Sequence, residues 1–335
     1  MGRRIMPAWL ENGVVVITGA SSGIGRAAAQ EFARRGASVV LAARNKRRLK
    51  DAAEECEELG GSALVVPTDV TVEEEVEELA RQAVDNFGAI DVWVNNAGVG
   101  LYARFVDSPA DDFRRVLETN LFGCIYGARA ALRQFERQGR GALINVSSQV
   151  ALGGIPYSSA YDISKHGVRG LGDTLRQEYV GTDISISTIF PASTDTPFFQ
   201  HAANYTGKAI RPLGSVSEAR KVAREIVRLA EHPQPEVLVG KHGYFMSLAH
   251  ALTPKQYDKV IRRMAEKQHF QKKAAEPTEG ALYEPQKPER VSGGWRKGGT
   301  LKKISKLALT GVAASAALSV VRARREQQRG VTRAA

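Results

Sequence analysis

A tyrosine and a lysine four residues apart could share the work of moving a proton. They stand in the segment Tyr161-Asp162-Ile163-Ser164-Lys165. If Tyr161 opens a helix, positions i and i+4 fall on one face, so both side chains can reach one site. A phenol has a pKa of about 10, and a nearby cation moves it toward the range where proton transfer is efficient. The pair therefore predicts general acid/base chemistry.

The spacing alone is weak evidence, because Tyr283 and Lys287 share it in a Pro-rich basic stretch where we expect no pocket. The first pair is distinguished by Ser148, which stands 13 residues before Tyr161 at the end of a predicted strand. A hydroxyl at that place would hydrogen-bond a substrate carbonyl and polarise it as hydride arrives. Ser147 is the weaker candidate for this role, since it fits a strand-end hydrogen bonder.

A glycine-rich turn, Thr18-Gly19-Ala20-Ser21-Ser22-Gly23-Ile24-Gly25, separates the apolar run Val14–Ile17 from a predicted helix over 26–35. Glycines let the backbone approach a pyrophosphate, and the N-terminus of a helix offers unpaired N–H groups and a positive dipole end. A second apolar strand, Ser38–Ala42, follows the helix. This β–turn–α–β order favours dinucleotide binding over a bare turn.

The end of the second strand indicates which dinucleotide binds. An enzyme preferring NAD would carry an acidic residue there, but this chain has Ala43 followed by Arg44. A guanidinium binds a 2′-phosphate well, and a carboxylate would repel it. We therefore expect NADP(H) in preference to NAD(H). The alternative is a solvated arginine in a basic run that continues to Arg48.

The alternation of strands and helices continues to residue 239. Seven strands, several of them apolar throughout, predict an α/β fold: a doubly wound parallel sheet with helices on both faces. A Ser108 N-cap with Pro109 at the first helical position is expected for one helix. The later predicted helices are Lys46–Leu59, Val72–Phe87, Pro109–Arg137, Tyr161–Val180 and Ser217–Glu231, and the strands are Ala63–Val66, Ile90–Val94, Ala142–Val146, Ile184–Ile189 and Glu236–Val239.

Charge divides the chain into a main domain over residues 1–240 and a basic extension over 241–335. Lys+Arg against Asp+Glu is 27 against 29 in the first part and 20 against 7 in the second. A near-neutral main domain argues against nucleic acid as a partner. We expect the extension to be partly helical, over Pro254–Gln271, and partly disordered, because Pro, Gly, Glu and Lys dominate 272–299.

Location and membrane contact are predicted from short segments. Arg3-Arg4 is not followed by an apolar run, and two cysteines make no disulfide framework, so we expect a cytoplasmic protein. No Cys/His spacing indicates a metal site. Leu307–Val321 has 15 uncharged residues between basic flanks, fewer than the ~20 that a bilayer span needs. It could lie on a membrane surface, giving peripheral contact through 301–325, or dock on protein.

Taken together, these motifs resemble the short, single-domain branch of the short-chain dehydrogenase/reductase family over about residues 12–240. The T-G-x-x-x-G-x-G turn, Asn95-Asn96-Ala97-Gly98, Ser148 and the Tyr161–Lys165 pair all occur in family order. The resemblance implies a Rossmann fold, a homo-oligomer and a proton relay through Asn120. This chain departs from the family pattern at Pro191-Ala192, where the family usually has Pro-Gly.

The resemblance also assigns residues to roles. Asp69 would contact the adenine, and Thr194 and Thr196 align with positions that contact the nicotinamide carboxamide and the pyrophosphate. The expected catalytic residues are Asn120, Ser148, Tyr161 and Lys165, with Ser148 and Tyr161 touching the substrate. The expected cofactor-binding residues are Thr18, Gly19, Ser21, Ser22, Gly23, Ile24, Gly25, Arg44, Asp69, Val70, Asn96, Ala97, Gly98, Tyr161, Lys165, Pro191, Thr194 and Thr196.

Three segments are expected around the substrate: Val99–Tyr102, Gln149–Tyr157 and Phe198–Arg211. They are apolar with few charges, which favours a bulky hydrophobic alcohol or ketone unless their aromatics pack the core or a dimer interface. The sequence thus predicts an NADP(H)-dependent oxidoreductase that interconverts an alcohol and a ketone or aldehyde. The alternative is a non-catalytic NADP(H)-binding scaffold or redox sensor that acts through its basic tail.

Overall fold

The structure is a computed structural model that describes residues 13–240, 243–287 and 290–297. Its centre is a parallel sheet in the order β12-β7-β6-β4-β1-β2-β3. The chain runs outward from β1 to β3 and then returns to place β4 on the other side of β1, so the order reverses between β1 and β4. The strands are β1 (Val14–Thr18), β2 (Ser38–Ala43), β3 (Ser62–Pro67), β4 (Val92–Asn95), β6 (Arg140–Val146), β7 (Asp183–Pro191) and β12 (Glu236–Val239).

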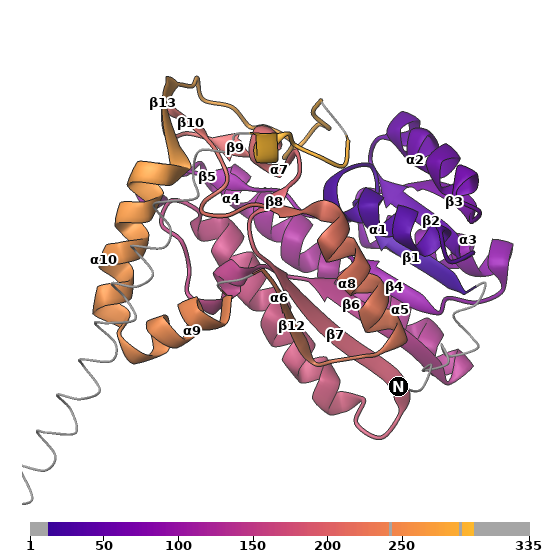
Figure 1. Cartoon of the computed structure of the whole chain (residues 1–335). Helices are drawn as coiled ribbons and strands as arrows, with labels where there is room; N and C mark the ends of the chain where they lie inside the picture. Colours follow the sequence, from indigo (N-terminus) through magenta and orange to yellow (C-terminus); the bar gives the residue numbers. More distant parts are fainter. Residues whose placement is uncertain (1–12, 241–242, 288–289, 298–335) are drawn as a thin grey trace, which may run out of the picture.

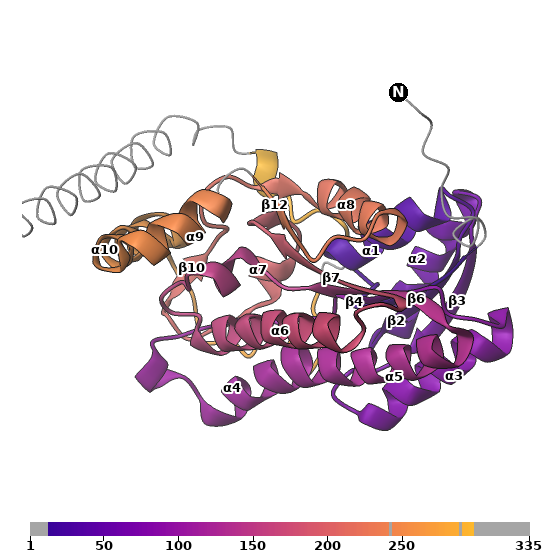
Figure 2. The same ribbon diagram turned by 90° about the horizontal axis from the view of Figure 1, so that it is seen from below.

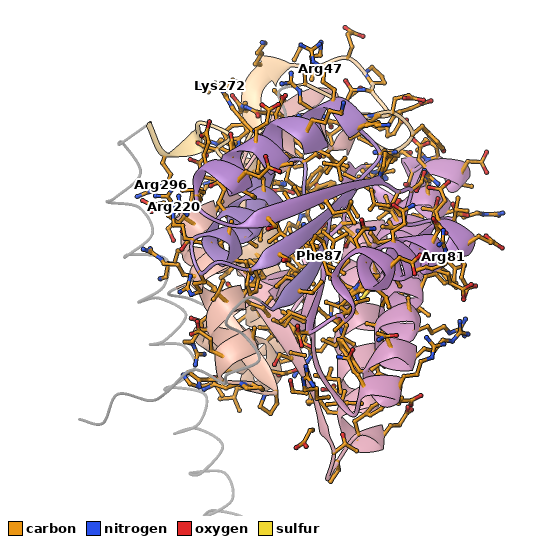
Figure 3. All side chains as sticks on the ribbon, turned by 90° about the vertical axis from the view of Figure 1, so that its right-hand side faces the viewer. Arg47, Arg81, Phe87, Arg220, Lys272 and Arg296 are labelled. Atoms are coloured by element: carbon orange, nitrogen blue, oxygen red, sulfur yellow. The ribbon has the colours of Figure 1, made fainter. Side chains whose placement is uncertain are left out.

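Helices cover both faces of this sheet (Figure 2). One apolar core joins the sheet to α1 (Gly23–Ala33), α2 (Lys46–Glu58) and α8 (Ala219–Glu231). A second core lies on the other face, against α3 (Glu73–Phe87), α5 (Gly123–Gln138) and α6 (Ser159–Glu178). The predicted doubly wound architecture is confirmed. Charged side chains such as Arg47 and Arg81 lie at the outline of the molecule (Figure 3).

The predicted helix over Pro109–Arg137 is interrupted. It consists of α4 (Ala110–Leu117), a π-helical turn over Glu118–Phe122 and α5. The prediction of a Ser108 N-cap is wrong: Pro109 occupies the cap position, and the buried Ser108 hydroxyl makes no hydrogen bond to the described residues. Pro109 itself has extended backbone (ψ 131°), so the first helical residue is Ala110 and not Pro109.

Beyond residue 240 the chain continues to pack on the domain. Two helices, α9 (Gly243–Leu252) and α10 (Pro254–Met264), lie together at one end of the molecule (Figure 1). The predicted helix over Pro254–Gln271 ends early, in a π-helical turn over Ala265–His269. The reason is tertiary, since β13 (Phe270–Ala274) pairs antiparallel with β10 (Lys208–Ile210).

Short strands and one short helix lie within the loops around the carboxyl edge of the sheet. β5 (Leu101–Tyr102) pairs with β9 (Ala203–Asn204), and β8 (Thr194–Asp195) pairs with β11 (Ser217–Glu218). The four-residue α7 (Phe198–His201) lies between β8 and β9. Against the expectation that 272–299 packs no core, Leu282 is fully buried with Val99, Leu101 and other apolar side chains.

The segment predicted to contact a membrane, 301–325, lies outside the described residues. Within the described part of the chain, no helix is both long and apolar enough to cross a bilayer. The same part of the chain holds no group of three or more His, Cys, Asp or Glu side chains arranged to bind a metal ion.

Candidate active site

One cavity of about 410 Å³ opens along the carboxyl edge of the sheet. Its walls include the turn after β1, the end of β2, and the loops after β4, β6 and β7. In an open α/β sheet, ligands bind in the crevice where the strand order reverses, because loops there diverge to opposite faces. The cavity lies at that reversal, between β1 and β4.

The glycine turn is packed tightly on the loop after β4. Gly19 has φ +68°, and a Cβ added to it would lie 2.8 Å from Cα of Ala97. A Cβ at Gly25 would overlap the carbonyl oxygen of Gly19. The Thr18 hydroxyl accepts hydrogen bonds from the amides of Asn96 (3.0 Å) and Ala97 (3.1 Å). Side chains at these places would push the turn off its support.

Thr18 and Gly25 therefore shape the turn without lining the cavity. The other predicted cofactor-binding residues all line it. They are Gly19, Ser21, Ser22, Gly23, Ile24, Arg44, Asp69, Val70, Asn96, Ala97, Gly98, Tyr161, Lys165, Pro191, Thr194 and Thr196. Helix α1 begins at Gly23, and Ser22, Gly23 and Ile24 line the cavity, so the N-terminal end of the helix faces it. This donor chemistry fits the pyrophosphate of an adenine dinucleotide.

Several of these side chains already have protein partners, and Asp69 and Arg44 have the most extensive ones. The Asp69 carboxylate pairs with Arg115 at 2.7 Å and accepts from Thr71, and these contacts hold its pKa below the ordinary value despite burial. The Arg44 guanidinium donates to the backbone carbonyls of Ala281 (2.6 Å), Leu282 (3.0 Å) and Tyr283 (2.7 Å). Sequence reasoning could not have found the Arg44 contacts, which join residues more than 230 positions apart.

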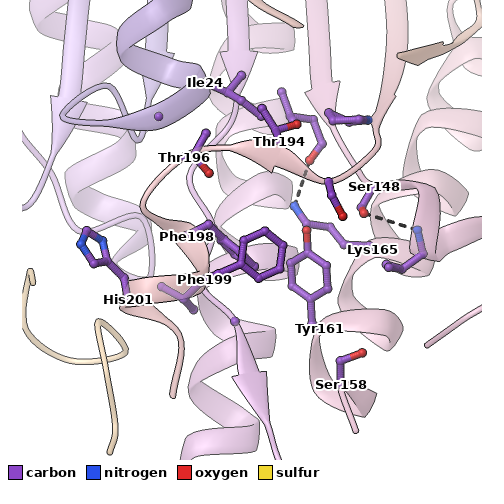
Figure 4. A pocket seen from close by; sticks show the side chains of 18 of the residues that line it. Ile24, Ser148, Ser158, Tyr161, Lys165, Thr194, Thr196, Phe198, Phe199 and His201 are labelled. Carbon is purple, nitrogen blue, oxygen red and sulfur yellow. Dashed lines mark hydrogen bonds between the residues drawn. The ribbon is translucent and has the colours of Figure 1, made fainter. Parts of the chain in front are cut away.

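Three of the predicted catalytic side chains meet in the same cavity, and Figure 4 shows them directed toward one another. Ser148 follows β6, while Tyr161 and Lys165 lie on the first two turns of α6, which begins at Ser159, two residues before Tyr161. The Lys165 Nζ lies 5.7 Å from the centroid of the Tyr161 ring and donates to the carbonyl of Val146 at 2.9 Å. The i and i+4 spacing thus places both groups on one face, as predicted.

The electrostatics differ from the sequence-based expectation. Burial raises the pKa of Tyr161 to about 12, and hydrogen bonding to Ser148 acts in the opposite direction without overcoming it. The Lys165 cation, expected to lower the phenol's pKa, is itself buried, and this lowers its own pKa to about 8. The phenol is therefore neutral at physiological pH, the form that can donate a proton.

The fourth predicted residue, Asn120, is held by the π-helical turn. Its Oδ1 accepts from the amide of Val99 (2.8 Å), and its Nδ2 donates to the carbonyl of Val99 (2.9 Å) and to the Ser164 hydroxyl (3.0 Å). It does not line the large cavity. Together with Lys165, Asn120 lines a separate cavity of about 10 Å³. This volume is about the space that one water molecule needs.

The substrate side contains residues that sequence reasoning missed. Phe198 packs against Tyr161 with ring centroids 5.3 Å apart, as the predicted segments imply. Leu101 and Tyr157, in contrast, do not line the cavity; Leu101 packs in the core, and Tyr157 contacts Phe270. The missed lining residues include Leu213, Tyr257, Val260, Ile261, Met264 and His269. A signal existed: Tyr257, Ile261 and Met264 recur at helical spacing.

Comparison with known proteins identifies the family. Residues 13–205 match the family model described as short chain dehydrogenase. An uncharacterized oxidoreductase of Bacillus subtilis, YxnA, is 36% identical over 82% of this chain and 79% of its own. The bovine 3-ketodihydrosphingosine reductase is 32% identical over 72% of this chain and 75% of its own. The chain belongs to the short-chain dehydrogenase family.

Solved structures give the same result. The alcohol dehydrogenase of Thermococcus sibiricus, solved with 5-hydroxy-NADP, superposes with a TM-score of 0.61 at 30% identity. That comparison covers 68% of this chain and 95% of the other. The protein is an oxidoreductase of the short-chain type, and members of this family bind NAD(P).

Proposed function

We propose that this protein is an NADP(H)-dependent oxidoreductase that interconverts a ketone or aldehyde and an alcohol on a bulky hydrophobic substrate, with Tyr161 as the general acid/base. The observation that carries the proposal is that Ser148, Tyr161 and Lys165 line one cavity with the glycine turn and the loop after β7. A carbonyl placed at the Tyr161 hydroxyl is therefore within the same cavity as a bound dinucleotide.

Separate groups supply the hydride and the proton that the reduction of a carbonyl requires. A bound nicotinamide would supply the hydride that reaches the carbonyl carbon. The Ser148 hydroxyl hydrogen-bonds the carbonyl oxygen and favours the negative charge that develops there. The neutral Tyr161 phenol then gives its proton to that oxygen, and Lys165 returns a proton to the phenolate. Oxidation of the alcohol runs through the same groups in reverse.

Asn120 supports the return of the proton. The cavity of about 10 Å³ between Asn120 and Lys165 could hold one water, which would link the ammonium to further donors. Because Asn120 is fixed by three hydrogen bonds, the position of that water would not depend on a mobile side chain. We infer that Asn120 positions the relay and does not touch the substrate.

The substrate class follows from the walls beyond Tyr161. Phe198, Phe199, Ile261 and Met264 make this end of the cavity apolar, and α10 covers it. An apolar cavity favours ligands that bury a large hydrophobic surface. The bovine relative is named for reducing 3-ketodihydrosphingosine, a ketone, and this supports a ketone as the oxidised substrate here.

The preference for NADP(H) rests on the end of β2. Ala43 and Arg44 line the cavity, and no carboxylate stands at the position where an acid would accept hydrogen bonds from a ribose 2′-hydroxyl. The Arg44 guanidinium donates to the carbonyls of residues 281–283 and keeps its positive charge, which favours a 2′-phosphate. The archaeal alcohol dehydrogenase in complex with 5-hydroxy-NADP supports the same assignment.

The test compares the wild type with Tyr161→Phe, using NADPH and a panel of hydrophobic ketones and aldehydes. Loss of the proton donor should lower kcat by about 10²–10⁴-fold. Tyr179→Phe is the matched control, because the Tyr179 hydroxyl donates to Glu136 and does not line the cavity. Equal turnover in Tyr161→Phe and wild type would remove the mechanism, and NADPH binding without turnover in either would favour the scaffold.

A further inference from the structure

A segment near the end of the described chain crosses the mouth of the cavity. We call residues 278–287 and 290–297 the strap; in Figure 1 they are the yellow part of the ribbon near α7. The strap follows β13, which ends at Ala274. Its Ala281, Pro285 and Gln286 line the same cavity as the glycine turn.

One end of the strap is anchored beside the expected adenosine site. Leu282 is 0% exposed and packs against Val99, Leu101 and their neighbours. Its carbonyl accepts from Arg115, the residue that also pairs with Asp69. The Tyr283 hydroxyl donates to Asp112 at 3.0 Å, which ties the strap to α4. This end therefore combines a buried apolar anchor with polar contacts.

The other end is anchored to the loop after β7. The Asp195 carboxylate accepts from the Ser292 hydroxyl (2.7 Å) and from the amide of Trp295 (2.8 Å). The Trp295 indole donates to the carbonyl of Thr196 at 3.0 Å. Gln200 of α7 donates to the carbonyl of Gly293 at 2.9 Å. Thr194 and Thr196 of this loop line the cavity, so the strap is tied to its rim.

Between its anchors the strap also contacts the glycine turn and the end of β2. The amide of Gly23, in the glycine turn, donates to the carbonyl of Arg290 at 3.0 Å. Arg44 donates to three successive carbonyls of the strap, those of residues 281–283. The strap therefore spans the cavity from the β2 end to the β7 loop, and the cavity of about 410 Å³ remains beneath it.

We propose that the strap is a further cofactor-binding element, which covers the adenosine half of a bound dinucleotide and is fastened by Arg44. The inference rests on the proposed function only in taking an adenine dinucleotide as the ligand. Because the strap lines the cavity instead of filling it, its role is to retain the cofactor. Entry and release then require the strap to lift from the rim that carries Gly23 and Arg44.

The first test compares two chains, one ending at Ala275 and one ending at Lys297, which keeps the strap. NADPH is bound to each without substrate, and its dissociation rate is measured by stopped-flow displacement with excess NADP⁺. The chain that lacks the strap should release NADPH at least about tenfold faster. An unchanged rate overturns the proposal, and so does tighter binding, which would mean that the segment competes with the cofactor.

The second test does not depend on the shorter chain folding. Tyr283→Phe combined with Ser292→Ala removes two anchoring hydrogen bonds, and neither residue lines the cavity. Two lost hydrogen bonds should raise the dissociation rate between about fivefold and 150-fold. Tyr179→Phe serves as the control with an unchanged rate. A rate in the double variant equal to that of the control overturns the strap's role even if the reductase activity stands.

Discussion

At the scale of single residues, burial decides the electrostatics more than sequence neighbours do. Tyr161 and Lys165 are both buried, so each shifts toward its neutral form: the tyrosine's pKa rises and the lysine's falls. His269 shows the same effect beside the substrate side of the cavity. It is 2% exposed, and burial lowers its pKa to about 4. Its ring lies edge-on to Tyr102 and Phe199.

His269 should therefore make stability depend on acid. The folded-state pKa of about 4 lies below the ordinary 6.5, so the unfolded chain takes up the proton first. This contribution to stability is complete above pH 6.5 and is lost as pH falls toward 4, on the order of 3 kcal/mol in all. His269→Phe keeps an aromatic ring and removes the titration.

Urea unfolding of both proteins at pH 7 and pH 4.5 measures the effect. The wild type should lose more free energy of unfolding between these pH values than His269→Phe does. Carboxylates titrate in both proteins alike, so the difference between the two losses isolates the imidazole. Equal losses would mean that His269 is charged in the folded state.

At the scale of elements, two π-helical turns determine where side chains of the site and its surroundings lie. The turn over Glu118–Phe122 holds Asn120 against Val99, and the turn over Ala265–His269 leads from α10 into β13. A π turn adds a residue to a helix and re-aims the side chains that follow. Helical periodicity predicted both helices but not these interruptions, because neither the hydrogen bonds of Asn120 nor the pairing of β13 with β10 is local.

The packing of α5 on the sheet gives a prediction at this scale. A Cβ at Gly127 would overlap Oδ1 of Asn95, which accepts from the Trp93 indole at 2.7 Å. Alanine is the better helix former by about 0.5–1 kcal/mol, but overpacking a buried site costs about 1–3 kcal/mol. Gly127→Ala should therefore lower the free energy of unfolding by roughly 1–2 kcal/mol.

Gly170→Ala in α6 is the matched control, because a Cβ there meets nothing within 4 Å. It should leave stability unchanged or raise it by up to about 1 kcal/mol. Chemical denaturation of the two variants measures both values. Stabilisation by both substitutions would show that Asn95 moves aside at no cost and that the contact does not constrain α5.

At the scale of the whole molecule, the cofactor site draws on distant parts of the chain. The glycine turn, the loop after β7 and the strap all line or border one cavity. A ligand that binds only the folded state raises the free energy of unfolding, by about 2.7 kcal/mol at 100 times its Kd. Because the site joins these segments, bound cofactor should stabilise the whole domain.

Thermal unfolding with each cofactor measures this effect and the role of Arg44. NADPH should raise Tm more than NADH at the same concentration, and Arg44→Asp should reverse that order. Arg47→Asp is the control, since it makes the same charge change nearby but does not line the cavity. The order of the two cofactors should not change in it. If NADPH still raises the Tm of Arg44→Asp more than NADH does, residues other than Arg44 bind the 2′-phosphate.

The sequence by itself determined the sheet and the glycine turn, and it predicted the set Ser148, Tyr161 and Lys165. These rest on local patterns: apolar runs, the strand–turn–helix order, and the i, i+4 spacing of Tyr161 and Lys165. Only the tertiary structure decided that α10 supplies the apolar wall of the cavity and that Arg44 binds the strap. The physical reason is that burial and contacts between distant segments depend on how the chain folds back on itself, and spacing carries no record of that.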